Sequence, residues 1–71
     1  MNTETKYLIW DAVGNRYRTG TGWVSSENEL SKNEKMLSFD SRKDADNLIN
    51  KGFINCRSYC ISKYHPLFKH C

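Results

Sequence analysis

The sequence predicts an α+β domain: a small antiparallel β-sheet with one α-helix packed on one face, in the order β-β-β-α-β. The N-terminal third is rich in aromatic and β-branched residues, and Gly14 and Asn15 interrupt it as a pair suited to a tight hairpin turn. Residues 42–51 carry an amphipathic helical pattern, and residues 53–64 return to an extended one. A helix covering one face of an antiparallel sheet buries the apolar side of both elements.

The first two strands are expected at residues 6–13 and 16–24, joined by the two-residue turn. With that turn, Asp11 lies opposite Arg18, so an opposite-charge pair falls on one face of the hairpin. The other face, which is expected to point into the core, carries Leu8, Trp10, Ala12 and Tyr17.

Two glycines interrupt the second of these strands. Gly20 and Gly22 indicate a bulge or bend, so we expect a kink near Thr21. The polar stretch at residues 25–35 has no sustained apolar period and is expected to be a flexible loop or one weak turn of helix. A short third strand is expected at residues 36–39.

The helix at residues 42–51 has the clearest local signals. Ser41 can cap its N-terminus, and Asp44 three residues later completes the spacing of a capping box. Gly52 stands where a C-terminal cap is expected. The apolar stripe that should pack on the sheet consists of Ala45, Leu48 and Ile49.

The last strand is expected at residues 53–64. Pro66 ends it, because proline cannot donate a hydrogen bond to a strand ladder. Residues 66–71 are then expected to form a flexible tail. Residues 1–71 make one domain, because a chain of this length leaves no room for a second unit above the lower limit of about 40 residues.

Composition restricts the partners. Eleven Lys and Arg against eight Asp and Glu give a net charge of +3, spread along the chain, which permits nucleic-acid binding without demanding it. No charged leader precedes an apolar stretch, and no apolar run has the length of a membrane span, so we expect a cytoplasmic protein without a membrane partner. So small a core also leaves homodimerisation open.

Metal-ligand residue types gather near the C-terminus. If residues 53–64 are extended, Cys56 and Cys60 lie roughly 13 Å apart, too far to share a zinc ion or a disulfide. We therefore expect reduced thiols, no metal and no cofactor. Only a helical segment would bring the two thiols together. The residues whose arrangement decides this are Cys56, Cys60, Cys71, His65 and His70.

No catalytic arrangement stands out in the chain. A catalytic thiol needs a cleft and an orienting group, and a domain with one helix on one sheet is expected to offer little concavity. The glycines near Thr21 do not make a phosphate-binding loop, because no third glycine follows them and no helix begins there. The sequence therefore predicts no enzymatic activity and no catalytic residues.

Two binding functions remain. The first is a protein-binding module that uses an exposed sheet face and edge, with Trp23, Arg16, Arg18 and Tyr17 as contacts, because Trp, Tyr and Arg are enriched at binding hot spots. The alternative is a nucleic-acid-binding module that stacks bases on a basic aromatic sheet face. A core position for Trp23 at the sheet end is also consistent with the sequence.

The arrangement of KYLIWD, RYRTGTGW, LSFDSRKDADNLINKGF and a closing ISKY resembles the short proteins carried by bacteriophages and prophages. The resemblance implies a role in host takeover or in inhibiting a bacterial defence protein, by stoichiometric binding in the host bacterial cytoplasm. Inhibitors of this kind that mimic DNA are strongly acidic, whereas this chain is net positive. An inhibitor that covers a surface of its target protein therefore fits the charge better.

Overall fold

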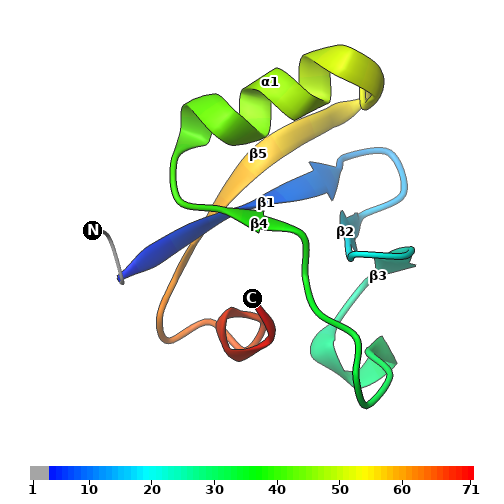
Figure 1. The fold of residues 1–71 in the computed structure, drawn as a ribbon. Coiled ribbons are helices and arrows are strands. Elements are labelled where there is room, and N and C mark those ends of the chain that lie inside the picture. Colours follow the sequence, from blue (N-terminus) through cyan, green and yellow to red (C-terminus); the bar gives the residue numbers. More distant parts are fainter. Residues whose placement is uncertain (1–3) are drawn as a thin grey trace.

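The sheet is built around one central strand, β1. The structure, a computed structural model, describes residues 4–71 and shows a five-stranded antiparallel sheet with one helix above it (Figure 1). The α+β class predicted from the sequence is confirmed. In chain order the strands are β1 (Thr5–Asp11), β2 (Arg16–Arg18), β3 (Trp23–Val24), β4 (Ser38–Phe39) and β5 (Cys56–Ser62).

Strand β1 is paired on both edges. Strand β5 pairs with it from end to end on one edge. On the other edge, β2 pairs with the C-terminal half of β1, and β4 pairs with the N-terminal half. Strand β3 follows β2 at the outside of the sheet.

The first hairpin has a different register from the prediction. Asp11 lies opposite Arg16 instead of Arg18, so residues 12–15 form the loop. The Asp11 carboxylate explains the longer loop, because its Oδ1 accepts the backbone N–H groups of Val13 at 3.0 Å and Gly14 at 3.1 Å. Ala12, expected in the core, is therefore an exposed loop residue.

The predicted second strand is divided by a turn. The backbone N–H of Thr19 donates to the carbonyl of Gly22 at 2.7 Å, and the Thr19 Oγ1 accepts the backbone N–H of Gly22 at 2.8 Å. The chain consequently reverses, so that Arg18 of β2 lies opposite Trp23 of β3. The kink expected near Thr21 is thus a complete reversal, which gives the sheet its fifth strand.

The helix α1 (Arg42–Gly52) matches its prediction to within one residue. Ser41 caps it, accepting the backbone N–H of Asp44 at 3.3 Å. Ala45 and Ile49 are buried against Ile9 of β1. The C-terminal cap predicted at Gly52 lies one residue later, at Phe53, and no glycine of the described chain has a positive φ. The helix instead runs through Gly52.

The tail beneath the sheet is ordered by packing. Leu67 is only 2% exposed and belongs to a buried cluster beneath the sheet. The other members are Leu8, Val24 and Ile61 of the strands and Met36 of the loop before β4. A single turn of 3-10 helix follows at Phe68–His70. The backbone N–H of Met36 donates to the carbonyl of His70 at 2.7 Å.

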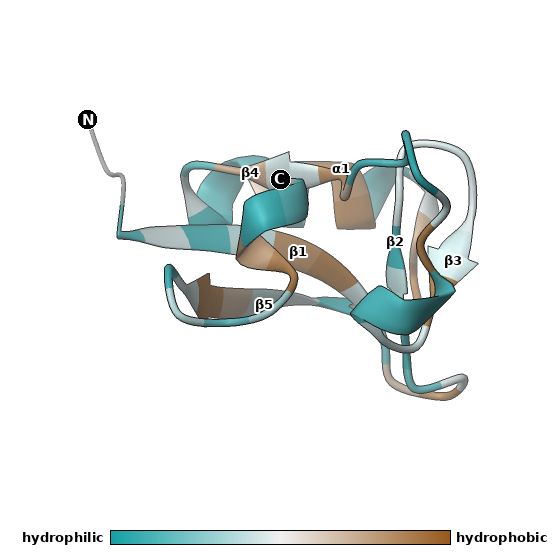
Figure 2. Cartoon of the chain, turned by 90° about the horizontal axis from the view of Figure 1, so that it is seen from below, coloured by the Kyte–Doolittle hydropathy of each residue, from teal (hydrophilic) through white to brown (hydrophobic). Residues whose placement is uncertain are grey.

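Both faces of the sheet are therefore covered. Helix α1 lies above it, and the C-terminal turn lies below (Figure 1); the view from below shows that turn across β1 (Figure 2). The expectation of one open sheet face is wrong, because it left the burial of Leu67 out of account.

The remaining segments follow their predictions in part. Within residues 25–35, Glu27–Glu29 form one turn of 3-10 helix. The third predicted strand is shorter than expected, although Met36 also forms an isolated bridge with Thr19. Strand β5 is extended as predicted but shorter at both ends than residues 53–64. Between residues 4 and 71, no helix has the length and apolar character needed to cross a membrane.

Candidate protein-binding surface

Three of the four predicted contact residues lie on one side of the sheet. Side chains alternate along a strand, so Arg16 and Arg18 point to the same face and Tyr17 to the other. Trp23 lies directly opposite Arg18, which brings its side chain to the arginine face. Below the sheet, the ring of Tyr17 packs against Tyr59 with centroids 5.5 Å apart.

The two arginines lie over the indole of Trp23. The guanidinium carbon is 4.7 Å from the ring centroid for Arg16 and 5.5 Å for Arg18, within the cation–π range of about 6 Å. The ring of Phe53, which follows α1, approaches Trp23 edge-on at 6.0 Å. We call these four side chains, Arg16, Arg18, Trp23 and Phe53, the Arg–Trp patch.

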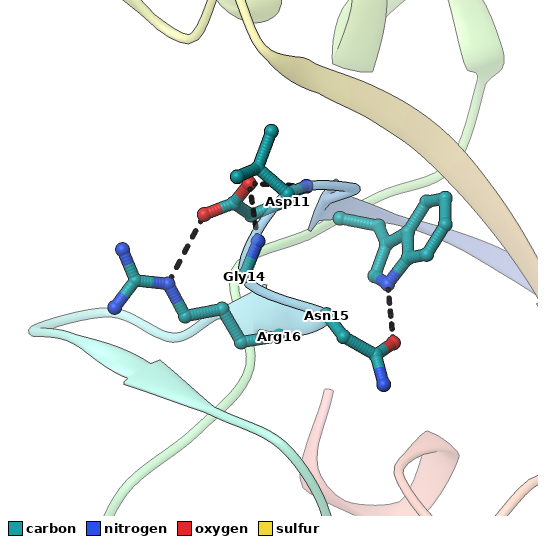
Figure 3. Close-up of polar contacts among 6 residues, drawn as sticks. Asp11, Gly14, Asn15 and Arg16 are labelled. Carbon is teal, nitrogen blue, oxygen red and sulfur yellow. Dashed lines mark hydrogen bonds and ion pairs between the residues drawn. The ribbon is translucent and has the colours of Figure 1, made fainter.

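Asp11 fixes the position of Arg16. It is 9% exposed, and its Oδ2 lies 3.1 Å from the Nε of Arg16 (Figure 3). The hydrogen bond from the Gly14 backbone lowers the pKa of Asp11 most, and the contacts with Arg16 and Val13 lower it further, whereas desolvation opposes them. The carboxylate therefore stays ionised at neutral pH and holds the guanidinium beside the indole.

This arrangement makes stability depend on pH. Because the pKa of Asp11 is lower in the folded chain than in the unfolded chain, its contribution is complete above the usual Asp pKa of about 3.9 and is lost as pH falls below it. We expect Asp11→Asn to lower the free energy of unfolding at neutral pH and to weaken its decline with acid. Urea unfolding followed by tryptophan fluorescence measures both effects, with Asp46→Asn on α1 as the charge-matched control. Parallel pH profiles for wild type and Asp11→Asn would contradict the assigned role of Asp11.

Exposed apolar side chains adjoin the Arg–Trp patch. Val13 and Ile54 are each 84% exposed and stand at a hollow of about 280 Å³. The sequence reasoning missed both, because it assigned them to strands, whereas they lie in the loop after β1 and in the link between α1 and β5. The hollow is lined by Asp11, Val13, Trp23, Gly52, Phe53, Ile54, Asn55 and Cys56.

A second aromatic cluster lies below the sheet and holds the tail. Tyr59 packs against Tyr17, Trp10 and His65, with ring centroids at 5.5, 6.0 and 6.4 Å. Burial, and then the neighbouring Tyr59, raise the pKa of Tyr17. The Nδ1 of His65 accepts the backbone N–H of Leu67 at 3.1 Å, so this histidine fixes the start of the tail. The packing of Tyr17 is thus separate from the Arg–Trp patch.

The cysteines do not form a common site. Cys56 and Cys60 both lie on the extended strand β5, and Cys71 ends the tail; all three are free thiols. Burial is the main cause that raises the pKa of Cys56 and of Cys71, which keeps both protonated at neutral pH and weakens them as nucleophiles. Among residues 4–71, no three His, Cys, Asp or Glu side chains converge closely enough to hold a metal ion.

A further hollow lies between α1 and β5. Its volume of about 440 Å³ is more concavity than the sequence led us to expect. Cys56 brings a thiol to it, but neither histidine lines it. The residues around it are Arg42, Asp46, Ile49, Asn50, Cys56, Arg57 and Ser58.

The Arg–Trp patch keeps an excess of positive charge. Asp11 neutralises Arg16, whereas no carboxylate within residues 4–71 forms an ion pair with Arg18. The guanidinium of Arg18 instead lies over two rings, those of Trp23 and Phe53.

Comparison with known protein families, with curated proteins and with solved structures finds no match to this chain.

Proposed function

We propose that this chain is a small non-enzymatic protein-binding module whose Arg–Trp patch contacts a partner protein. The observation that carries the proposal is the half-buried indole of Trp23 held beside two guanidiniums, with the exposed side chains of Val13 and Ile54 next to it. Trp and Arg are enriched at binding hot spots. Because the contacts with the arginines already restrict the side chain of Trp23, it loses little conformational entropy on binding.

The charge of the patch selects the kind of partner. Arg16 is already paired with Asp11, whereas Arg18 is not neutralised in this way, so a complementary surface would present a carboxylate near an apolar contact. Together with the resemblance to phage and prophage proteins, this supports an inhibitor or modulator of a bacterial host or defence protein in the bacterial cytoplasm. Such an inhibitor acts by covering its target, so it needs no active site.

The alternative, a nucleic-acid-binding module, requires ring faces on which bases can stack. The arginines occupy space over the ring of Trp23, and the aromatic cluster of Tyr17 and Tyr59 lies below the sheet against His65. The geometry therefore favours a protein partner over single-stranded nucleic acid.

Affinity capture from a bacterial lysate tests the proposal. We expect wild type to retain a specific protein, whereas Trp23→Ala and the double variant Arg16→Ala, Arg18→Ala each lose at least about tenfold in affinity, which corresponds to about 1.4 kcal/mol. Tyr64→Ala is the matched control, because that tyrosine is 83% exposed and lies outside the patch. Circular dichroism verifies that each variant is folded.

Two outcomes would overturn the proposal. The first is capture of no protein, or capture that all variants share equally. The second is retention of a labelled oligonucleotide that decreases steeply with salt, which would favour the nucleic-acid alternative because such binding releases counterions.

A further inference from the structure

Strand β5 has one edge without a neighbouring strand. Its seven residues pair with β1 on one side, and no other strand within residues 4–71 pairs with it. In the view from below, β5 runs along one margin of the sheet (Figure 2). The opposite margin is different, because β3 and β4 have only two residues each and are too short to template a further strand.

The open edge presents a defined set of backbone groups. The N–H of Lys63 donates to the carbonyl of Glu4, at 2.8 Å, so residue 63 faces the side of β1. In an antiparallel ladder this direction alternates, so the backbone groups of residues 57, 59 and 61 also face β1. Those of Ser58, Cys60 and Ser62 face the open edge, as does the carbonyl of Cys56, whose N–H already donates to the carbonyl of Phe53 at 2.9 Å.

This edge has few of the features that normally prevent strand pairing. Natural edge strands carry charged side chains, proline or a bulge. The residues of β5 whose backbone faces outward are Cys56, Ser58, Cys60 and Ser62, all small and uncharged. Arg57 is the one charged residue of β5, and the strand contains no proline. Its register with β1 is unbroken from Cys56 to Ser62, so no bulge twists it away.

We infer that β5 pairs with β5 of a second copy of this chain, antiparallel, about a two-fold axis through Tyr59. Tyr59 is the middle residue of the strand, so this register pairs all seven residues. It places Ser58 opposite Cys60 of the second copy, and their outward N–H and C=O groups satisfy each other. Arg57 lies opposite Ile61, so no like charges face each other.

Neighbouring registers are less favourable. Moving the axis to Cys60 places Arg57 opposite Lys63 of the second copy, and like charges directly opposite are destabilising. Moving it to Ser58 places Ile61 opposite Asn55, outside the strand, and shortens the paired segment. The sequence of β5 therefore selects the register centred on Tyr59.

The dimer goes beyond the proposed partner binding and keeps Trp23 of the Arg–Trp patch away from the paired edge. Strands β2 and β3 lie on the other side of β1 from β5, so Trp23 lies toward the far margin of the sheet in each copy. Two five-stranded sheets would join into one, with Trp23 of each copy toward the outer margin. Such a dimer is bivalent toward an oligomeric target.

The backbone of Cys60 gives the sharpest test. Because Cys56 begins β5, residues 1–55 carrying a C-terminal thioester can be ligated to a synthetic peptide of residues 56–71 without changing the sequence. One peptide carries an N-methyl group on Cys60, which removes an outward donor, and the control carries it on Ile61, which removes a donor facing β1. Sedimentation velocity over a concentration series measures the oligomeric state, and circular dichroism the fold.

We expect the unmodified chain to show a concentration-dependent monomer–dimer equilibrium. The N-methyl-Cys60 chain should be a folded monomer, and the N-methyl-Ile61 chain should lose stability. Even a weak dimer forms at a protein concentration of about 1 mM. If the unmodified chain stays monomeric up to that concentration, the inference is overturned, and the edge of β5 would instead pair with a segment of another protein. Persistence of the dimer after N-methylation of Cys60 would overturn it equally.

Cross-linking tests the register with recombinant protein. In a background of Cys56→Ser and Cys71→Ser, the substitution Ser58→Cys places a thiol opposite Cys60 of the second copy, at a Cα separation of about 5.5 Å that a disulfide can span. Glutathione disulfide oxidises the two thiols and is itself reduced to two glutathione molecules. Peptide mapping should find the intermolecular 58–60 linkage, and a predominant 60–60 linkage would contradict the register centred on Tyr59.

Discussion

Leu67→Ala is expected to destabilise the domain by about 2–5 kcal/mol, the usual range for truncating a buried leucine. Leu67 is 2% exposed and packs against the lower face of the sheet, so its loss leaves a cavity beside Leu8 and Ile61. A domain of this size has a total stability of about 4–10 kcal/mol, at roughly 0.05–0.15 kcal/mol per residue. The variant should therefore lose a large share of its stability and unfold at a much lower urea concentration than wild type.

Urea unfolding followed by tryptophan fluorescence measures the effect of Leu67→Ala. Val13→Ala is the control, because an apolar residue that is 84% exposed should change stability by no more than about 0.5 kcal/mol. If both variants unfold at the urea concentration of wild type, Leu67 is not seated under the sheet. The lower face would then be open, as the sequence alone suggested.

Thr19→Val has the second-largest expected effect, about 1–3 kcal/mol, although it changes the volume little. Thr19 is 0% exposed, and its hydroxyl accepts the backbone N–H groups of Gly22 at 2.8 Å and Thr21 at 3.3 Å. The same hydroxyl donates to the Oε2 of Glu34 at 2.7 Å. Valine leaves these groups without their partner, and it removes the side-chain bonds of the turn between β2 and β3, although the backbone bond from Thr19 to Gly22 remains.

Thr21→Val provides the comparison for Thr19→Val. Its hydroxyl also donates to Glu34, at 3.0 Å, but the residue is exposed, so we expect a much smaller loss of stability. The hydrogen bond from the Thr19 hydroxyl is the main cause that lowers the pKa of Glu34. The contribution of the Glu34 carboxylate to folding stability is therefore complete above the usual pKa of a glutamate and is lost as pH falls below it. Thr19→Val should therefore also weaken the loss of stability in acid. Equal urea midpoints for the two variants would contradict the role of the buried hydroxyl.

The elements that could be predicted are those with local signals. Helix α1 follows from Ser41, Asp44 and an apolar stripe, all within about three turns of chain. Strand β5 follows from its extended alternation, which also separates Cys56 from Cys60. In both segments the local preference agrees with the packing.

The errors arise where a side chain bonds to the backbone of a turn. Gly14 and Asn15 suggested a two-residue turn, but the Asp11 carboxylate binds two loop N–H groups and moves the register by two residues. Thr19 similarly converts an expected kink into a reversal. The packing of the tail was not predicted, because Leu67 is buried mainly by residues distant in sequence. Such packing leaves no periodic apolar pattern in the tail itself.

Part of the Arg–Trp patch could be predicted and part could not. Arg16 and Arg18 are two residues apart on a strand, so alternation alone puts them on one face and Tyr17 on the other. The approach of Trp23 depends on the reversal at Thr19. The approach of Phe53 depends on where α1 ends relative to β3, which only the tertiary structure determines.

The most direct test of this surface is a map of proton–proton nuclear Overhauser effects from the indole of Trp23. We predict cross-peaks from the indole to the ring of Phe53 and to the side chains of Arg16 and Arg18, on the helix side of the sheet. Cross-peaks from the indole to the ring of Tyr17 instead would place Trp23 below the sheet and contradict the Arg–Trp patch.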